Sequence, residues 1–188
     1  MSPRPLLLCA AVSFVTACAT PPESSPGVDG TDPNSNYELP THPTQNTAGG
    51  IPEGRRAVVE RVVDGDTIVV YDGERIRLTG IDTPETVKPG SPIECFGKEA
   101  SRYLAELLPE GTEVMLVRDV EEFDRYDRTL SYVYIVASGN FVNAEMVAQG
   151  YAYSYTYPPN VAHAEEFAEM QSEAQANNRG LWSACPVP

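Results

Sequence analysis

Residues 67–78 read Thr-Ile-Val-Val-Tyr-Asp-Gly-Glu-Arg-Ile-Arg-Leu, two strand-like runs on either side of an Asp-Gly pair. β-branched and aromatic residues favour strands, and Asp-Gly between two such runs is a strong signal for a tight hairpin turn. In the second run Ile76 and Leu78 alternate with Arg75 and Arg77. Because successive side chains of a strand point to opposite faces, both arginines are predicted to share one face of a sheet.

Strand and helix patterns continue from this hairpin in both directions. Apolar residues predict a preceding strand within residues 57–63 and two later strands at 113–117 and 130–137. Apolar positions at helical spacing predict helices within residues 100–108, 142–149 and 162–177, whereas the proline-containing residues 83–92 predict a loop. Three strands, a helix, two strands and two helices predict an α+β fold, a small barrel that carries helices.

Composition and charge exclude several classes of protein. The 188 residues include 13 Lys+Arg against 27 Asp+Glu, a net charge of −14, and 41% are hydrophobic. This composition is that of one globular domain with some chain left over. The chain has no run of 18 apolar residues, which excludes a multi-span membrane protein. Such an acidic chain is not a non-specific coat for DNA, although a local group of arginines can still bind phosphate.

The first 18 residues are predicted to be a secretory signal. One basic residue, Arg4, precedes mostly apolar residues 6–15, and Val15-Thr16-Ala17-Cys18 follows. This ending resembles a bacterial lipobox, which predicts a mature chain anchored to a membrane of the cell envelope through a lipidated Cys18. The alternative is an ordinary cleaved signal and a secreted protein. Residues 19–54 are rich in proline and predict a flexible linker, which leaves a folded domain at 55–188.

Acidic and arginine residues gather in two short motifs. Asp64-Gly65-Asp66-Thr67 places two carboxylates around a glycine, and Arg77 is soon followed by Asp82-Thr83-Pro84-Glu85. Taken alone, a polar turn and a surface ion pair explain these motifs as well as any chemistry does. Together they offer hard oxygen ligands for a cation, a carboxylate that can act on water and a guanidinium for phosphate. A metal-assisted phosphodiesterase needs those groups.

Taken in chain order, the motifs resemble those of the thermonuclease, or staphylococcal nuclease, family. The matching segments are Val63-Asp64-Gly65-Asp66-Thr67, Arg77-Leu78, Ile81-Asp82-Thr83-Pro84-Glu85-Thr86, Asp124-Arg125-Tyr126-Asp127-Arg128, Tyr155-Thr156-Tyr157-Pro158-Pro159-Asn160 and Ser172-Glu173-Ala174-Gln175-Ala176. The resemblance covers about residues 58–182. It implies a five-stranded oligonucleotide-binding (OB) barrel with three helices, in agreement with the predicted order of elements.

The resemblance also implies an activity and a metal. The protein would be a monomeric, Ca²⁺-dependent endonuclease that hydrolyses DNA and RNA with little sequence specificity and leaves 3′-phosphate ends. The implied Ca²⁺ ligands are the side chains of Asp66 and Asp82 and the carbonyl of Thr83. Glu85 would orient or deprotonate the attacking water. Asp64 lies in the same motif, where stabilising the turn and supporting the metal ligands are both open roles.

The substrate contacts are implied in the same way. Arg77 and Arg128 would bind the scissile phosphate and stabilise the charge that develops on it. Three tyrosines would contact the nucleotide by stacking and through their hydroxyls: Tyr126, Tyr155 and Tyr157. Tyr151 and Tyr153 alternate with the last two and are predicted to be half-buried instead. Stacking on tyrosine tolerates any base, which suits an enzyme of low sequence specificity.

Three departures from the family pattern put the rate in question, one of which is a short first hairpin joined only by Asp72-Gly73. Asp127 stands where the family has a glycine, beside Arg128, and Pro158 stands where a lysine is frequent. Two other functions therefore remain open: a catalytically weak nucleic-acid-binding module on the same fold, and an envelope lipoprotein that binds Ca²⁺ structurally. The first alternative has to explain why all the polar residues that match the family's catalytic set are retained.

The remaining cysteines and charged residues are predicted to be structural. Cys95 precedes the first predicted helix and Cys185 follows the last, and an exported chain favours a disulfide between them over two free thiols. His163 is predicted to lie on the solvated face of a helix. The acidic run 119–122 is predicted to be a solvated loop rather than a second metal site.

Overall fold

The computed structural model describes residues 50–86 and 93–185. The predicted signal segment, Cys18 and residues 19–49 of the predicted linker lie outside these ranges. The end of that linker is described: Ile51 packs against the hydrophobic core, and the first strand begins at Arg55. Within the two described ranges, none of the helices has the length and apolar composition needed to cross a bilayer.

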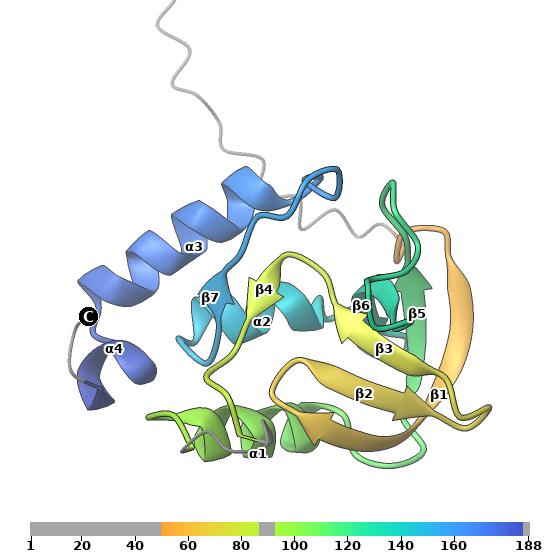
Figure 1. Ribbon diagram of the computed structural model, residues 1–188, viewed down its shortest axis with the longest axis horizontal. Helices are drawn as coiled ribbons and strands as arrows, with labels where there is room; N and C mark the ends of the chain where they lie inside the picture. The colour runs from red at the N-terminus through yellow and green to blue at the C-terminus, as the bar shows by residue number, and fades with distance from the viewer. Residues whose placement is uncertain (1–49, 87–92, 186–188) are drawn as a thin grey trace, which may run out of the picture. The chain divides into compact units, whose positions relative to one another are not determined.

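Five strands close into a barrel, which confirms the predicted architecture (Figure 1). They are β1 (Arg55–Asp64), β2 (Thr67–Val70), β3 (Arg75–Leu78), β5 (Glu113–Val117) and β6 (Thr129–Ile135). The order around the barrel is β1, β2, β3, β6, β5. The pair β3–β6 is parallel, and the other four pairs are antiparallel.

The register of the strands brings residues of the two polar motifs side by side. Thr67 at the start of β2 lies opposite Arg77 of β3, and Arg77 in turn lies opposite Leu130 of β6. Leu130 comes two residues after Arg128. The antiparallel pairing of β1 and β2 ends at Asp64 and Thr67, with Asp66 in the turn between them. The barrel therefore gathers segments that are far apart in the sequence.

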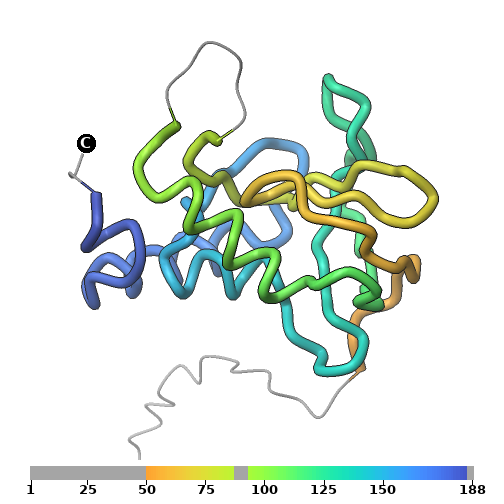
Figure 2. Tube along the Cα trace, turned by 90° about the horizontal axis from the view of Figure 1, so that it is seen from below, coloured from red at the N-terminus to blue at the C-terminus, as the bar shows by residue number. Residues whose placement is uncertain are grey.

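Three helices flank the barrel, as predicted, and a short fourth helix follows them. They are α1 (Gly97–Leu107), α2 (Val142–Ala148), α3 (Ala164–Ala176) and the unpredicted α4 (Leu181–Ala184). Figure 1 shows α3 and α4 beside the barrel, and Figure 2 shows α1 crossing the molecule near the viewer. α1 packs against β1, and α2 packs against both α3 and β6.

The core fills the barrel and continues under the helices. Its fully buried side chains come from both kinds of element and include Ile68, Ile76, Val133, Leu104 and Phe167. Burying each such side chain contributes about 1.5–3 kcal/mol. In β3, Ile76 and Leu78 alternate with Arg75 and Arg77. Both apolar side chains therefore point toward the core.

One buried polar side chain ties α2 to the barrel. Asn143 is fully buried, accepts a hydrogen bond from the Val133 amide at 2.9 Å and donates one to the Thr79 carbonyl at 2.8 Å. A buried amide satisfied in this way fixes the position of the helix on the sheet.

A second, two-stranded sheet was not predicted. β4 (Ile81–Asp82) pairs with β7 (Tyr153–Ser154), so that Asp82 lies opposite Tyr153. Figure 1 shows the pair between β3 and α3. Strands of two residues leave no periodic signal in a sequence, and this pair forms only because the barrel and α3 bring its halves together.

Tyr151, Tyr153 and His163 each pack against other aromatic rings. Tyr151 stacks on Tyr103 with ring centroids 4.0 Å apart, and Tyr153 meets the edge of Trp182, so both are half-buried. His163 is half-buried rather than fully solvated: its side chain is 27% exposed, and its Nδ1 lies 2.6 Å from Glu166 Oε2. Its ring packs against Tyr132 and Phe141, with centroids 4.5 and 4.8 Å away, because it stands at the start of α3 and faces the core.

A disulfide joins Cys95 to Cys185, whose Cα atoms lie 5.9 Å apart. Cys95 stands just before α1, and Cys185 caps the end of α4. The crosslink therefore ties the start of the first helix to the end of the last one.

Candidate active site

The side chains of the two polar motifs meet where four strands begin or end. Thr67 begins β2, Arg77 lies near the end of β3, Asp82 ends β4, and Arg128 immediately precedes β6. Asp66 sits in the turn before Thr67 and is only 6% exposed. These residues form one continuous line of contacts.

The line begins at Asp82 and runs through Arg77 to Asp66. Arg77 donates from Nη2 to Asp82 Oδ1 at 2.8 Å, and its Nη1 lies 2.6 Å from Asp66 Oδ2. Thr67 donates from its hydroxyl to Asp66 Oδ1 at 3.0 Å, and Arg128 donates from Nη1 to that hydroxyl at 3.3 Å. Two carboxylates thus converge on one guanidinium, with a second guanidinium close behind them.

This donor set fits a hard divalent cation. Asp66 and Asp82 face the same positive group, and the Thr83 amide and hydroxyl both donate to Asp66 Oδ2, at 3.2 and 3.1 Å. Carboxylates are oxygen ligands of the kind that Ca²⁺ takes, and the remaining positions around such a cation would be left to other oxygen donors, water or phosphate. Within residues 50–86 and 93–185 no group of three or more His, Cys, Asp or Glu side chains is placed to hold a metal, so a cation here would have only two acidic ligands.

Burial alters the protonation of the acids beside this set. Burial, followed by the negative charge of Asp66, raises the pKa of Asp64 to about 6. Asp64 also accepts a hydrogen bond from the Asp66 amide at 3.2 Å, which stabilises the turn. Burial raises the pKa of Asp82 above its ordinary value and outweighs the opposite effect of Arg77. Burial is thus the main cause for both carboxyls, because it disfavours the charged form of an acid.

Asp124 holds the second arginine, a role that sequence reasoning did not assign. Its Oδ2 accepts hydrogen bonds from Nε of Arg128 at 2.7 Å and lies 2.7 Å from Nη2, a two-point contact. Its Oδ1 accepts from the amides of Tyr126 and Arg128. Burial acts to raise the pKa of Asp124, but these hydrogen bonds hold it below its ordinary value. The available signal was an aspartate four residues before an arginine within the matched motif.

Asp127 adopts the backbone conformation that a glycine would favour. Its φ is +62°, in the left-handed region, and its amide donates to the Asp124 carbonyl at 3.1 Å. Aspartate tolerates this region better than most residues, so the turn keeps its shape without the glycine. The side chain of Asp127 is exposed, and Arg128 is paired with Asp124.

The tyrosines line a cleft of about 540 Å³ next to the arginines. Tyr126, Tyr155 and Tyr157 are 64%, 51% and 59% exposed. The rings of Tyr155 and Tyr157 are nearly parallel, with centroids 6.5 Å apart, and the Arg125 guanidinium lies 4.7 Å above the Tyr126 ring. Arg77, Asp82 and Arg128 line the same cleft. Exposed aromatic faces beside guanidinium groups are suited to bases and phosphates.

Sequence reasoning assigned no role in the cleft to several residues that line it, among them Phe123, Arg125 and Asn160. Asn160 is buried, accepts hydrogen bonds from the amides of Val120 and Glu121, and donates to the Glu121 carbonyl. It therefore pins the loop before β6 to the tyrosine segment. These contacts join residues about 40 positions apart, and such pairs produce no local pattern in a single sequence.

Glu85 lies three residues after Asp82, on the loop that follows β4. Its Oε1 accepts a hydrogen bond from the Thr86 amide at 2.9 Å, and its own backbone is bonded to Glu94. Asp66, Thr83 and Glu85 do not line the cleft itself, whereas the other six predicted residues do.

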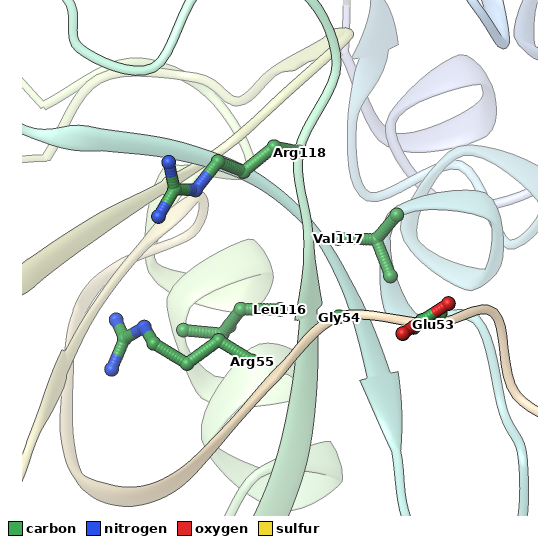
Figure 3. A pocket seen from close by; sticks show the side chains of 6 residues that line it. All are labelled: Glu53, Gly54, Arg55, Leu116, Val117 and Arg118. Carbon is green, nitrogen blue, oxygen red and sulfur yellow. The ribbon is translucent and has the colours of Figure 1, made fainter.

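A second hollow, of about 460 Å³, lies against β1 and β5 (Figure 3). Figure 3 shows the guanidinium groups of Arg55 and Arg118 on the same side of it. Arg118 is paired with Glu122 at 2.7 Å, and Arg55 is paired with Glu74. None of the predicted site residues lines this hollow, whereas six of them line the tyrosine-lined cleft, so the candidate site is that cleft.

Comparison with known proteins points to one family. A family model described as staphylococcal nuclease homologue matches residues 75–184. A thermonuclease from Staphylococcus intermedius is 40% identical over 132 residues, which are 69% of this chain and 77% of that protein. A thermonuclease from Staphylococcus hyicus is 41% identical over 128 residues, 66% and 74% of the two chains. An endonuclease from Bacillus subtilis is 34% identical over 129 residues, 66% of this chain and 60% of that protein.

Proposed function

This chain belongs to the staphylococcal nuclease family, and we propose that it is a Ca²⁺-dependent endonuclease acting on DNA and RNA with little sequence specificity. Its activity is that of a nuclease, a hydrolase of phosphodiester bonds. The observation that carries the proposal is the unbroken line of contacts from Asp82 through Arg77, Asp66 and Thr67 to Arg128, beside a cleft lined by exposed tyrosines.

Asp66, Asp82 and the Thr83 carbonyl are the proposed Ca²⁺ ligands. When bound, the cation supplies positive charge to the phosphate and to the water that attacks it. Asp66 is held in place for this task by Thr67 and Thr83, which donate to its two different oxygens. Asp82 is fixed by its position opposite Tyr153 in the β4–β7 pair.

Arg77 and Arg128 are the proposed phosphate ligands. Their side chains are 13% and 19% exposed, so each guanidinium meets the cleft from a largely buried position. Donors held rigidly in such a site stabilise negative charge that develops on the phosphate oxygens, and they require little reorganisation. Asp124 supplies that rigidity to Arg128 through its two-point contact.

Glu85 is the proposed general base or water-orienting group. Water attacks phosphorus, a new P–O bond forms, and the bond from phosphorus to the 5′ oxygen breaks. Glu85 accepts one proton from the attacking water and later releases it to solvent, and the departing 5′ oxygen takes up one proton from solvent. These steps give the 3′-phosphate end that the proposal requires.

Export and membrane anchoring are part of the proposal. A disulfide in the folded domain supports a chain that folds in an oxidising compartment. We propose that Cys18 is lipidated and holds a monomeric domain at the cell envelope, with secretion as the outcome if it is not. Mass spectrometry of the envelope fraction, looking for a diacylated peptide that begins at Cys18, tests this directly.

Replacing Glu85 with glutamine is expected to slow turnover by about 10²-fold or more, the usual contribution of a general base. Glutamine keeps the size of the side chain and an acceptor oxygen, so substrate binding should stay nearly intact. Single-turnover cleavage of labelled DNA gives the rate, and fluorescence titration gives the affinity. An equal loss of rate and affinity would assign Glu85 a structural role in the loop instead.

A further inference from the structure

We propose that Glu94 is a positioning residue that fixes the backbone of Glu85. The inference rests on the proposed function, in which Glu85 acts on the attacking water. Sequence reasoning assigned no role to Glu94, which stands in an exposed segment just before α1.

Two reciprocal hydrogen bonds join the residues. The Glu85 amide donates to Glu94 Oε2 at 3.0 Å, and the Glu94 amide donates to the Glu85 carbonyl at 2.9 Å. The first bond is made to a carboxylate, and such charge-assisted bonds are about twice as strong as neutral ones. The two bonds hold both backbone polar groups of Glu85, and so restrict where its side chain begins.

The segment that carries Glu94 is itself held against the loop. The Glu94 carbonyl accepts a hydrogen bond from the Gly97 amide at 3.2 Å. A Cβ at Gly97 would lie 2.8 Å from the Pro84 carbonyl oxygen and 3.1 Å from that of Glu85. Only glycine therefore lets the start of α1 approach the loop this closely.

The disulfide anchors this segment from its other side. Cys95, the residue after Glu94, is bonded to Cys185 at the end of α4. The residues that contact the Glu85 backbone are thus tied both to α1 and to the last helix. Because this segment is anchored on both sides, its hydrogen bonds fix the position of the Glu85 backbone. A free segment would not do so.

The positioning role predicts a specific kinetic effect. A displacement of about 1 Å at a reacting group can cost about 10²-fold in rate. The Glu94 side chain is exposed, and the reciprocal backbone bond remains after substitution, so a partial effect is expected. In Glu94→Ala we expect kcat to fall about tenfold, KM to stay unchanged and the Glu85 amide to exchange its hydrogen faster.

Three variants of the full chain test this. Glu94→Ala removes the acceptor, Glu94→Gln keeps an acceptor oxygen, and Glu106→Ala removes an exposed charge from α1 as a matched control. Hydrogen exchange of the segment that contains Glu85 is measured without substrate, and kcat and KM are measured with Ca²⁺ and single-stranded DNA. We expect Glu94→Gln to recover most of both properties and Glu106→Ala to match the wild type.

A combined variant identifies the residue through which Glu94 acts. On a Glu85→Gln background, Glu94→Ala should cause no further loss of kcat, because the group being positioned is already gone. A further tenfold loss there would overturn the proposal.

Other outcomes would overturn it as well. These are unchanged exchange of the Glu85 amide in Glu94→Ala, faster exchange with no change in kcat, or equal losses in Glu94→Gln and Glu94→Ala. Failure of the proposed function is distinguishable, because it appears as a wild-type chain that does not cleave DNA, whereas exchange at Glu85 is measured without cleavage.

Discussion

Replacing Asp82 with alanine is expected to abolish Ca²⁺-stimulated cleavage and to weaken Ca²⁺ binding. The substitution removes one of the two carboxylates that converge on Arg77 and leaves Asp66 as the sole acidic ligand of the proposed site. Ca²⁺ takes six to eight oxygen ligands and is held weakly when few of them are charged. Isothermal titration gives the affinity, and cleavage of plasmid DNA gives the rate.

The fold should survive this change. Asp82 is half exposed, and burial already opposes its ionised form, so its loss should alter the free energy of unfolding by no more than about 1 kcal/mol. Asp72→Ala, which removes an exposed carboxylate near Arg55, is the matched control and should cleave like the wild type. Full Ca²⁺-dependent activity in Asp82→Ala would contradict the proposed ligand set.

Removing the disulfide is expected to lower the free energy of unfolding by about 4–5 kcal/mol. Cys95 and Cys185 are separated by 90 positions, and the chain-entropy model gives a loop of this length a stabilisation of that size. Urea unfolding of the Cys95→Ser/Cys185→Ser double variant measures it. The slope of the free energy against urea should also rise, because the unfolded chain becomes less compact.

A reducing agent provides the control for this prediction. The wild type with reductant should unfold like the double variant, while the double variant itself should not respond to reductant. Mass spectrometry under non-reducing conditions that found both thiols free in protein purified from the envelope would contradict the crosslink.

Local patterns were enough to predict the barrel and its three helices. The Asp-Gly turn and the alternation of Ile76 and Leu78 specify β2 and β3, because hairpin signals act within a few residues. The β4–β7 pair escaped prediction because it depends on Asp82 meeting Tyr153 across about 70 positions. The partial burial of His163 escaped prediction for a similar reason: its aromatic partners Tyr132 and Phe141 come from other parts of the chain.

The sequence motifs supplied candidate residues for the site but not the contacts between them. The ordered motifs identified Asp66, Asp82 and the two arginines, and the register of the barrel brings them together. Thr67 and Asp124, which support Asp66 and Arg128, and Glu94, which contacts Glu85, act through contacts that a linear sequence does not display. The left-handed conformation of Asp127 likewise depends on the turn around it.

The most direct test of the central proposal is cleavage of plasmid DNA by the purified wild-type chain in Ca²⁺ and in excess EGTA. We expect nicked and linear products in Ca²⁺, 3′-phosphate at the new ends, and intact plasmid in EGTA. Full cleavage in EGTA, or an intact plasmid in Ca²⁺, would contradict a Ca²⁺-dependent nuclease.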